Sequence, residues 1–318
     1  MPLVKFFAKR LLGVVVIVLV VSFLVFSLLA LSPGSIVTTL IGTQPSTPEV
    51  VAGIKAKYHL DDPFLVQYWD WLVRALHGDF GQSVQSGQNV TSVIGNHLPV
   101  TLELAAYALV FVVVIGIPAG MLAGMRWGSV VDKGLSGLSI LGMSAPGFAI
   151  GIILIYLFGV RFSIFPTFGA GDGSFVSRID HLTLPAVTLA IGLTALIMRQ
   201  TRAATLTVMK QDYITFARAR GVHPIRILIR YALRNTALPI VTAGGLLLIT
   251  AISGAVLIET VFSLEGEGQL MVTSISAKDV PVVQGLAFFV ALFVVVLNVI
   301  VDALALIIDP RTRVAAKS

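Results

Sequence analysis

The sequence contains no cysteine and few charged residues. Of its 318 residues only 12% are charged, whereas 56% are hydrophobic, and the mean hydropathy is +0.95. The absence of cysteine excludes disulfides, zinc–thiolate sites and thiol catalysis. A soluble domain carries about 25% charged residues, so this chain has too little charge to cover its surface in water. The composition therefore indicates an all-α polytopic membrane protein.

Six apolar runs are candidates for crossing a bilayer, which takes about 20 residues of helix because every backbone polar group must be satisfied within the segment. They are residues 11–31, 102–125, 135–158, 182–198, 237–257 and 282–308. The fourth run is the shortest and weakest. The first is longer than the core of a signal peptide and ends in Leu31-Ser32-Pro33-Gly34 rather than in a cleavage site. We therefore expect six transmembrane helices.

The runs divide the chain into four parts. Residues 1–31 form a cytoplasmic N-terminus and first span, 32–100 an extracytoplasmic segment, 101–308 a core of five spans, and 309–318 a cytoplasmic tail. About 70 residues are marginal as an independent domain. The extracytoplasmic segment nevertheless carries enough apolar side chains to pack against the bundle. These are Phe64, Tyr68, Trp69 and Trp71.

The basic residues predict the orientation, because Lys and Arg in short loops stay in the cytoplasm. With the N-terminus inside, 16 of the 22 basic residues lie in cytoplasmic segments and 12 of the 16 acidic residues lie outside. Both termini are then cytoplasmic. The net charge of +6 thus reflects topology, and we expect contact with membrane lipid and none with nucleic acid.

The segment between the fourth and fifth spans is unusually basic. Residues 199–234 hold eight basic residues and one acid, Asp212. Asp212 is a suitable helix N-cap and Gly221 a suitable C-terminal stop. On the enclosed short helix, either Tyr213, Phe216 and Ala217 or Ile214, Ala217 and Gly221 share one side. Such a helix fits insertion into the groove of a partner protein. A plain basic connector is the alternative.

These residues resemble the cytoplasmic signature loop of permease subunits of ABC importers, specifically the dipeptide/oligopeptide branch. The pattern is Asp-Tyr-x-x-x-Ala-Arg-Ala-Arg-Gly at 212–221, followed by Arg-Tyr-Ala-Leu-Arg-Asn-Thr-Ala-Leu-Pro at 230–239. Further matches run in order along nearly the whole chain. They are Leu60-Asp61-Asp62-Pro63, Gln67-Tyr68, Gly78-Asp79-Phe80-Gly81, Leu98-Pro99-x-Thr101-Leu102-Glu103-Leu104, Glu259-Thr260-Val261-Phe262-Ser263 and Asp309-Pro310-Arg311.

The resemblance implies a type I ABC importer permease-like bundle with a cytoplasmic coupling helix in loop 199–236. It also implies partners: a second permease (a homologue or a copy of this chain), two cytoplasmic ATPases and an extracytoplasmic substrate-binding protein. Ala217 and Gly221 match the small positions of the family's Glu-Ala-Ala-x3-Gly core, while Thr215 and Phe216 replace its Glu and first Ala. The implied ATPase-coupling residues are Asp212, Tyr213, Thr215, Phe216, Ala217, Arg218, Ala219, Arg220 and Gly221.

No catalytic role is expected for this chain. It has no Gly-x4-Gly-Lys-Ser/Thr motif, so ATP and Mg²⁺ are expected on the partner ATPases. The five histidines lack metal-ligand spacing, and we expect no metal site. Glu103, Glu259 and Asn298 are polar residues in or near spans and are candidates for the translocation path or gate. We expect Glu103 and Glu259 to lie near the outer boundary, where solvent can reach them.

Small residues and prolines in the spans have simpler roles. Gly116, Gly120 and Gly124 recur every fourth residue, which allows close helix packing within the bundle. Pro118, Pro146 and Pro185 are expected to kink their spans. The expected substrates are di- and oligopeptides, with a nickel complex or glutathione as alternatives. A self-contained secondary transporter or channel is the competing function.

Overall fold

The computed structural model describes residues 2–31, 47–57 and 61–308. In this part of the chain most residues are helical, and the only β-pairing is one isolated antiparallel bridge between Gln82 and Asn89. The chain divides into two compact units: unit 1 comprises Met1–Pro99 and Gly266–Leu297, and unit 2 comprises Val100–Glu265 and Asn298–Ser318. The all-α fold expected from the composition is confirmed.

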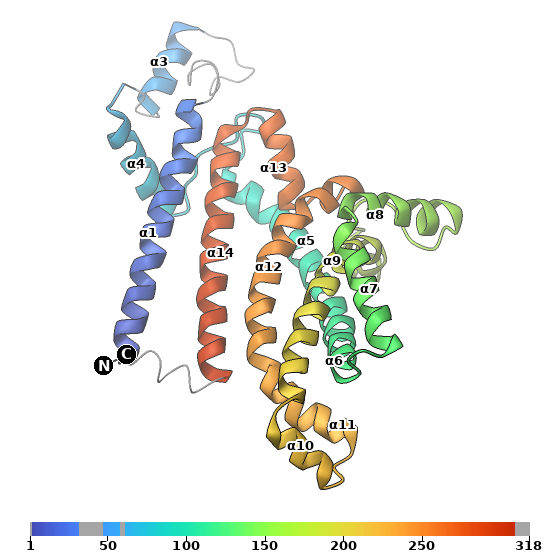
Figure 1. Ribbon diagram of the computed structural model, residues 1–318. Coiled ribbons are helices and arrows are strands. Elements are labelled where there is room, and N and C mark those ends of the chain that lie inside the picture. The colour runs from blue at the N-terminus through green and yellow to red at the C-terminus, as the bar shows by residue number, and fades with distance from the viewer. Residues whose placement is uncertain (1, 32–46, 58–60, 309–318) are drawn as a thin grey trace. The chain divides into compact units, whose positions relative to one another are not determined.

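Unit 1 is built from N-terminal helices and from parts of two helices that it shares with unit 2 (Figure 1). Its helices are α1 (Pro2–Leu31), α3 (Pro48–Lys57), α4 (Phe64–Leu76), α13 (Glu267–Ser276) and the first parts of α5 (Val90–Phe111) and α14 (Val280–Ile308). One apolar cluster joins α1, α4 and α14 through the rings of Phe26, Trp71 and Phe288. A second packs α5 against α14 around Val90 and Leu286.

A buried carboxylate organises the turn that precedes α5. Asp279, 2% exposed, accepts the hydroxyl proton of Ser83 at 2.5 Å and the amide protons of Val84 and Gln85 at 3.1 and 3.3 Å. Three donors compensate for the burial of the negative charge. The conformation of the segment before α5 therefore depends on a residue almost 200 positions further along the chain.

Unit 2 is centred on α9 (Phe175–Met209), which packs against α6, α7, α8 and α12. Its other helical segments are the ends of α5 and α14, the π-helical η1 (Val112–Gly116), α6 (Ile117–Met125), α7 (Val130–Ser144), α8 (Gly147–Leu154), the π-helical η2 (Ile155–Arg161), α10 (Asp212–Ala219), α11 (Pro224–Arg226), the π-helical η3 (Ile227–Leu233) and α12 (Arg234–Phe262). The core of the unit contains side chains from α5, α9 and α12.

All six predicted runs lie on helices, but the structure does not confirm the predicted number of six transmembrane spans. Four helices in the described residues are long and apolar enough to cross a membrane: Val90–Met125, Phe175–Met209, Pro224–Phe262 and Val280–Leu304. The described apolar part of α1, Leu12–Ser27, is shorter. The predicted fourth span, 182–198, is the apolar middle of the longer helix α9, which continues through the charged residues on both sides of it.

The third predicted span is broken rather than continuous. Val130–Ser144 and Gly147–Arg161 meet at an angle of 99° and count as one span only as a bent pair. Ala145, the residue before Pro146, is extended at φ −81° and ψ 128°. A residue before proline avoids the helical region because of the clash with the proline ring. The kink expected at Pro146 is thus present.

Candidate functional site

Helix α10 lies between the ends of two long helices, at one end of unit 2 (Figure 1). It begins at Asp212, as the sequence indicated, but Asp212 is not its N-cap. Gln211 occupies that position with an extended backbone, and its side chain forms no capping hydrogen bond. Asp212 instead lies in the first turn, where a negative charge interacts favourably with the helix dipole.

The end of α10 is fixed by Gly221. Its φ is +71°, a conformation that glycine adopts without the steric penalty of a Cβ atom. The Gly221 amide donates to the Arg218 carbonyl at 2.9 Å, and the Val222 amide donates to the Ala217 carbonyl at 3.1 Å. This pair of bonds is a Schellman motif. The predicted stop at Gly221 is confirmed.

One face of α10 packs against the chain itself. Ile214 is fully buried and Ala217 is 5% exposed. They belong to an apolar cluster with Met121 of α6, Val208 of α9 and Ile227 of η3. Of the two faces that the sequence allowed, the structure therefore selects Ile214 and Ala217 as the inner one. Ala217 is a small residue facing its own bundle and is not available to a partner.

The opposite face of α10 is exposed and aromatic. Phe216 is 68% exposed and Tyr213 39% exposed. The remaining residues of the predicted coupling set also lie on the exposed side: Asp212, Thr215, Arg218, Ala219 and Arg220. A large exposed aromatic ring beside cationic side chains is a composition common in protein interfaces. This face can receive a partner while the inner face holds the helix in place.

Most of the predicted loop 199–236 is helical. Helix α9 continues to Met209, and the next long helix begins at Pro224 rather than near residue 237. Pro224 stands in the first turn of α11, where its missing amide proton costs nothing. The basic residues that suggested a loop lie on helix ends instead. As a result, α10 is joined to α9 and to α11–η3–α12 by only a few non-helical residues.

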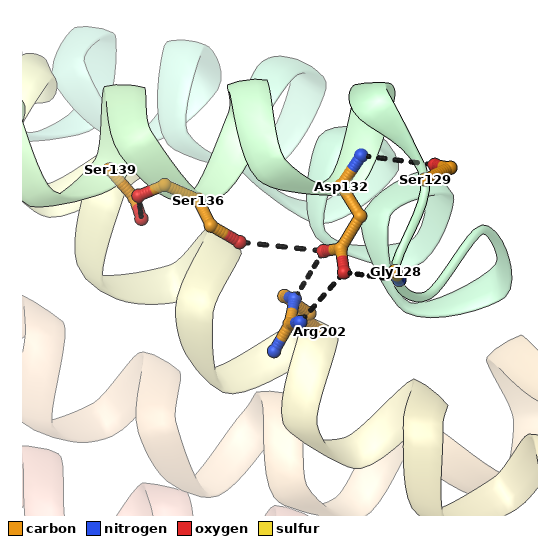
Figure 2. Close-up of polar contacts among 6 residues, drawn as sticks. All are labelled: Gly128, Ser129, Asp132, Ser136, Ser139 and Arg202. Carbon is orange, nitrogen blue, oxygen red and sulfur yellow. Dashed lines mark hydrogen bonds and ion pairs between the residues drawn. The ribbon is translucent and has the colours of Figure 1, made fainter.

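An ion pair connects the turn between α6 and α7 to α9 (Figure 2). Arg202 donates from Nε to Asp132 Oδ1 at 2.5 Å and from an NH2 group to Oδ2 at 2.8 Å. The Gly128 amide donates to Oδ2 at 2.9 Å, and the Ser136 hydroxyl donates weakly to Oδ1 at 3.4 Å. Ser129 caps α7 by accepting the Asp132 amide proton. The Asp132 side chain is 4% exposed.

A second contact joins the same turn to the residue next to α10. The Lys210 ammonium lies 5.5 Å from the ring centre of Trp127, within the range of a cation–π interaction. Lys210 is the C-cap of α9 and directly precedes the N-cap of α10. The turn at 126–129 is therefore attached to α9 both by Asp132 and by Trp127. Neither contact was predicted from the sequence. The only local signal was the Ser129–x–x–Asp132 spacing, which is typical of a helix N-cap.

The three candidate gate residues occupy different environments. Glu259 in α12 is fully buried, contrary to the expected solvation, and it accepts the Thr101 hydroxyl proton at 2.7 Å. Glu103 has a 44% exposed side chain and pairs with Arg178 at 2.8 Å. Asn298 is exposed. The structure thus pairs Glu259 with Thr101 and Glu103 with Arg178.

The glycine repeat of residues 116–124 packs inside unit 2. A Cβ on Gly120 would lie 2.5 Å from the Met198 carbonyl oxygen, and one on Gly124 would lie 2.7 Å from Thr205 Cβ. Helices α6 and α9 therefore approach so closely that only glycine fits. Packing within the bundle, the role expected from the spacing, is confirmed.

An apolar hollow of about 340 Å³ lies beside the bend between α7 and α8. Its walls come from α7, α8, α9 and α12, and include Met143, Phe148, Thr188, Thr250 and Leu257. The only polar side chains among its lining residues are threonines. The bend between α7 and α8 is therefore bordered by an open and almost entirely apolar space.

Known protein families and relatives match this sequence along almost the whole chain. The family profile "Binding-protein-dependent transport system inner membrane component" matches residues 116–314, and the corresponding N-terminal profile matches residues 3–105. The chain is 35% identical to a putative peptide permease protein of Brucella suis, covering 98% of this chain and 100% of the relative. It is 34% identical to the dipeptide transport system permease protein DppB of Escherichia coli K12, covering 96% and 98%.

A further relative and a solved structure agree with these matches. A putative peptide transport system permease protein of Brucella abortus is 38% identical, with 96% of this chain and 98% of the relative covered. The fold is similar to a chain of the inward-facing MetNI methionine ABC transporter, with a TM-score of 0.57 and 20% identity over 68% of this chain and 96% of that chain. At this level of identity the structural match supports the fold alone.

Proposed function

The chain belongs to the family of binding-protein-dependent transport system inner membrane components, and we propose that it is a permease subunit of an ATP-driven importer of di- and oligopeptides. The substrate class rests on relatives that are described as peptide or dipeptide permeases and that align over nearly their full length. Within the importer function, a nickel complex and glutathione are the alternative substrates.

The observation that carries the coupling role is the division of α10 into two faces. Ile214 and Ala217 hold the helix against α6, α9 and η3, while Phe216 and Tyr213 are exposed. We assign the exposed face, with Thr215, Arg218, Ala219 and Arg220, to the groove of an ATPase subunit. Asp212 and Gly221 set the ends of the helix. Because α10 is packed at the junction of two long helices, a displacement of the ATPase is transmitted directly to α9 and α12.

An ion pair and a cation–π contact would carry the same displacement to a third helix, α7. Asp132 fixes the start of α7 to Arg202 of α9, and Trp127 contacts Lys210 beside α10. The ion pair from the first turn of α7 and the cation–π contact from the turn before it both restrict movement of α7 relative to α9. Helix α7 leads into the bend at Pro146 and the apolar hollow. A movement of α10 can therefore reach the apolar hollow beside this bend.

The proposed assembly contains this chain, a second permease that is a homologue or an identical copy, two cytoplasmic ATPases and an extracytoplasmic substrate-binding protein. ATP and Mg²⁺ would bind to the ATPases, and this chain would hold no cofactor. Glu103, Glu259 and Asn298 stay candidates for the translocation path. The distribution of basic residues supports cytoplasmic N- and C-termini and places α10 on the cytoplasmic side of a bacterial plasma membrane.

Reconstitution tests this function. Proteoliposomes containing both permeases are prepared with and without the cognate ATPases, and uptake of labelled dipeptide, tripeptide, nickel complex and glutathione is measured in the presence of the binding protein. We expect peptide uptake only with ATPases and ATP. Uptake that persists without the ATPases would identify a secondary transporter or channel instead.

A substitution on the exposed face of α10 tests whether this helix couples transport to the ATPases. Truncation of an exposed interface aromatic at the centre of a contact costs about 2 kcal/mol, or roughly 30-fold in affinity. We therefore expect Phe216→Ala to weaken ATPase binding and ATP-dependent uptake while the permease still inserts. The control is Phe162→Ala, since Phe162 is also exposed, at 60%, but lies far from α10 in the sequence. Equal effects of the two variants would contradict the coupling role.

A further inference from the structure

Helix α4 of unit 1 has three distinct faces. At 100° per residue, one sector contains Phe64, Tyr68, Trp71, Leu72 and Ala75. A second contains Leu65, Trp69, Val73 and Leu76, together with Val66. All three polar residues share the third sector. They are Gln67, Asp70 and Arg74.

The first sector packs against α1 and α14. The Tyr68 hydroxyl lies 2.8 Å from the Ser22 hydroxyl of α1 and donates to the Leu19 carbonyl at 3.2 Å. The Trp71 ring lies 5.9 Å from that of Phe288 in α14. Figure 1 shows α4 beside the C-terminal half of α1. The position of α4 is therefore defined by two other helices of the same unit.

These contacts place α4 at membrane depth. Phe288 is eight residues into α14, a candidate span that begins at Val280, which corresponds to about 12 Å at 1.5 Å per residue. The α1 rings that pack against Tyr68 and Phe64 are Phe23 and Phe26, in the C-terminal half of the uncharged run 11–31. The Gln284 side-chain amide donates to the Val25 and Phe26 carbonyls at 3.4 and 3.3 Å, so α1 and α14 run at matching levels. The contacts of α4 thus lie inside the apolar part of both helices.

The second sector has no protein covering in the described structure of unit 1. Leu65 is 67% exposed, Trp69 61% and Leu76 64%. Helix α1 also has exposed apolar side chains between the residues that contact α4, including Val20 at 53% and Leu24 at 59%. A helix in water would carry polar residues on every exposed side. Here they are restricted to one sector, as in helices that lie in a membrane interface.

We propose that α4 is an interfacial helix, whose face formed by Leu65, Trp69, Val73 and Leu76 contacts phospholipid acyl chains in the leaflet at the C-terminal end of α1. The Gln67, Asp70 and Arg74 sector then faces headgroups and water, and Trp69 lies where tryptophan is enriched in membrane proteins. Helix α4 is accordingly attached to the bilayer along this face. This proposal does not depend on the transported substrate.

The absence of cysteine provides a direct test. Single cysteines are introduced as Leu65→Cys, Trp69→Cys and Leu76→Cys, with Gln67→Cys and Arg74→Cys as matched controls on the polar sector of the same helix. The full chain is spin-labelled, reconstituted into phosphatidylcholine vesicles, and examined by EPR. Collision with oxygen, which concentrates in acyl chains, is compared with collision with a water-soluble nickel chelate.

We expect a several-fold higher oxygen-to-nickel ratio at positions 65, 69 and 76 than at 67 and 74. Similar nickel accessibility at all five positions would overturn the proposal, because α4 would then lie in water. Labels at 65, 69 and 76 that are shielded from both reagents would also overturn it, and would indicate a protein partner on this face. Three independent positions protect the result against misfolding of any one variant.

A second measurement uses the natural tryptophans. The chain has three, Trp69, Trp71 and Trp127, so the Trp71→Phe, Trp127→Phe protein reports only Trp69. We expect its fluorescence to be quenched by phospholipids brominated along the acyl chain and to resist aqueous iodide. Quenching by iodide alone would contradict contact with lipid.

Discussion

The Arg202 guanidinium holds both carboxylate oxygens of Asp132, at 2.5 and 2.8 Å, although the two residues are 70 positions apart. The pair fastens α7 to the part of α9 that leads to α10. Arg202 has a 28% exposed side chain and Asp132 a 4% exposed one. The bond is therefore protected from water on the carboxylate side, and Asp132 would be left in an unfavourable environment without its partner.

Removing the charge of Asp132 should destabilise unit 2. Hydrogen bonds to charged groups contribute about 1.5–3 kcal/mol, so we expect Asp132→Asn to lower the free energy of unfolding by about 2 kcal/mol. The change is measured by thermal unfolding in detergent, followed by tryptophan fluorescence. The control is Glu103→Gln, which breaks the more exposed pair with Arg178 and should cost less than about 1 kcal/mol. A larger loss in the control would contradict this assignment.

Gly221 should be required for its backbone conformation alone. A Cβ at Gly221 or at Gly134 meets nothing within 4 Å, but only Gly221 has a positive φ, +71°. We expect Gly221→Ala to cost about 1–2 kcal/mol and to reduce ATP-coupled uptake, whereas Gly134→Ala should have no adverse effect. Gly221→Pro should abolish coupling, because proline cannot adopt a positive φ and lacks the amide that bonds to Arg218. Wild-type uptake by the proline variant would disprove a coupling role for this turn.

The two faces of α10 should respond differently to a charge. Ala217 is 5% exposed, so Ala217→Glu buries a carboxylate and should detach α10 from its apolar cluster. Ala219 is exposed, and Ala219→Glu should leave the helix in place. Limited proteolysis with trypsin measures this, since Arg218 and Arg220 are cleavage sites on α10. Faster cleavage is expected only in the Ala217 variant, and equal rates would contradict the assignment of the inner face.

Close packing between α6 and α9 should make Gly120 intolerant of any side chain. Its Cβ would lie 2.5 Å from the Met198 carbonyl oxygen, so Gly120→Ala forces the helices apart at a cost of about 1–3 kcal/mol. Gly137→Ala is the matched control, because a Cβ on Gly137 meets nothing within 4 Å. Purified protein would be compared by thermal unfolding. Unchanged stability of Gly120→Ala would show that the two helices pack less closely than described.

The local features of α10 could be predicted from residue types. Asp212 and Gly221 bound a helix that forms where expected, because glycine accepts the positive φ at which the helix ends. The positions of the six apolar runs were also predictable, since they reflect only composition. The ends of the helices were not: Pro185 is accommodated inside α9, whereas Pro146 breaks its span. Residue type alone therefore does not tell which proline ends a helix.

The sequence by itself determined an all-α membrane protein, its family and the place of α10, because these follow from hydropathy, residue order and local conformational preference. Only the tertiary structure decided which face of α10 is free, since Ala217 and Phe216 are neighbours in sequence and packing against α6, α9 and η3 buries the first and leaves the second exposed. It also paired Asp132 with Arg202, and Glu259 with Thr101. The scarce charges therefore do more than mark the topology. Asp132 and Glu259 are buried and hydrogen-bonded, because burying an unpaired charge inside a membrane bundle costs too much free energy.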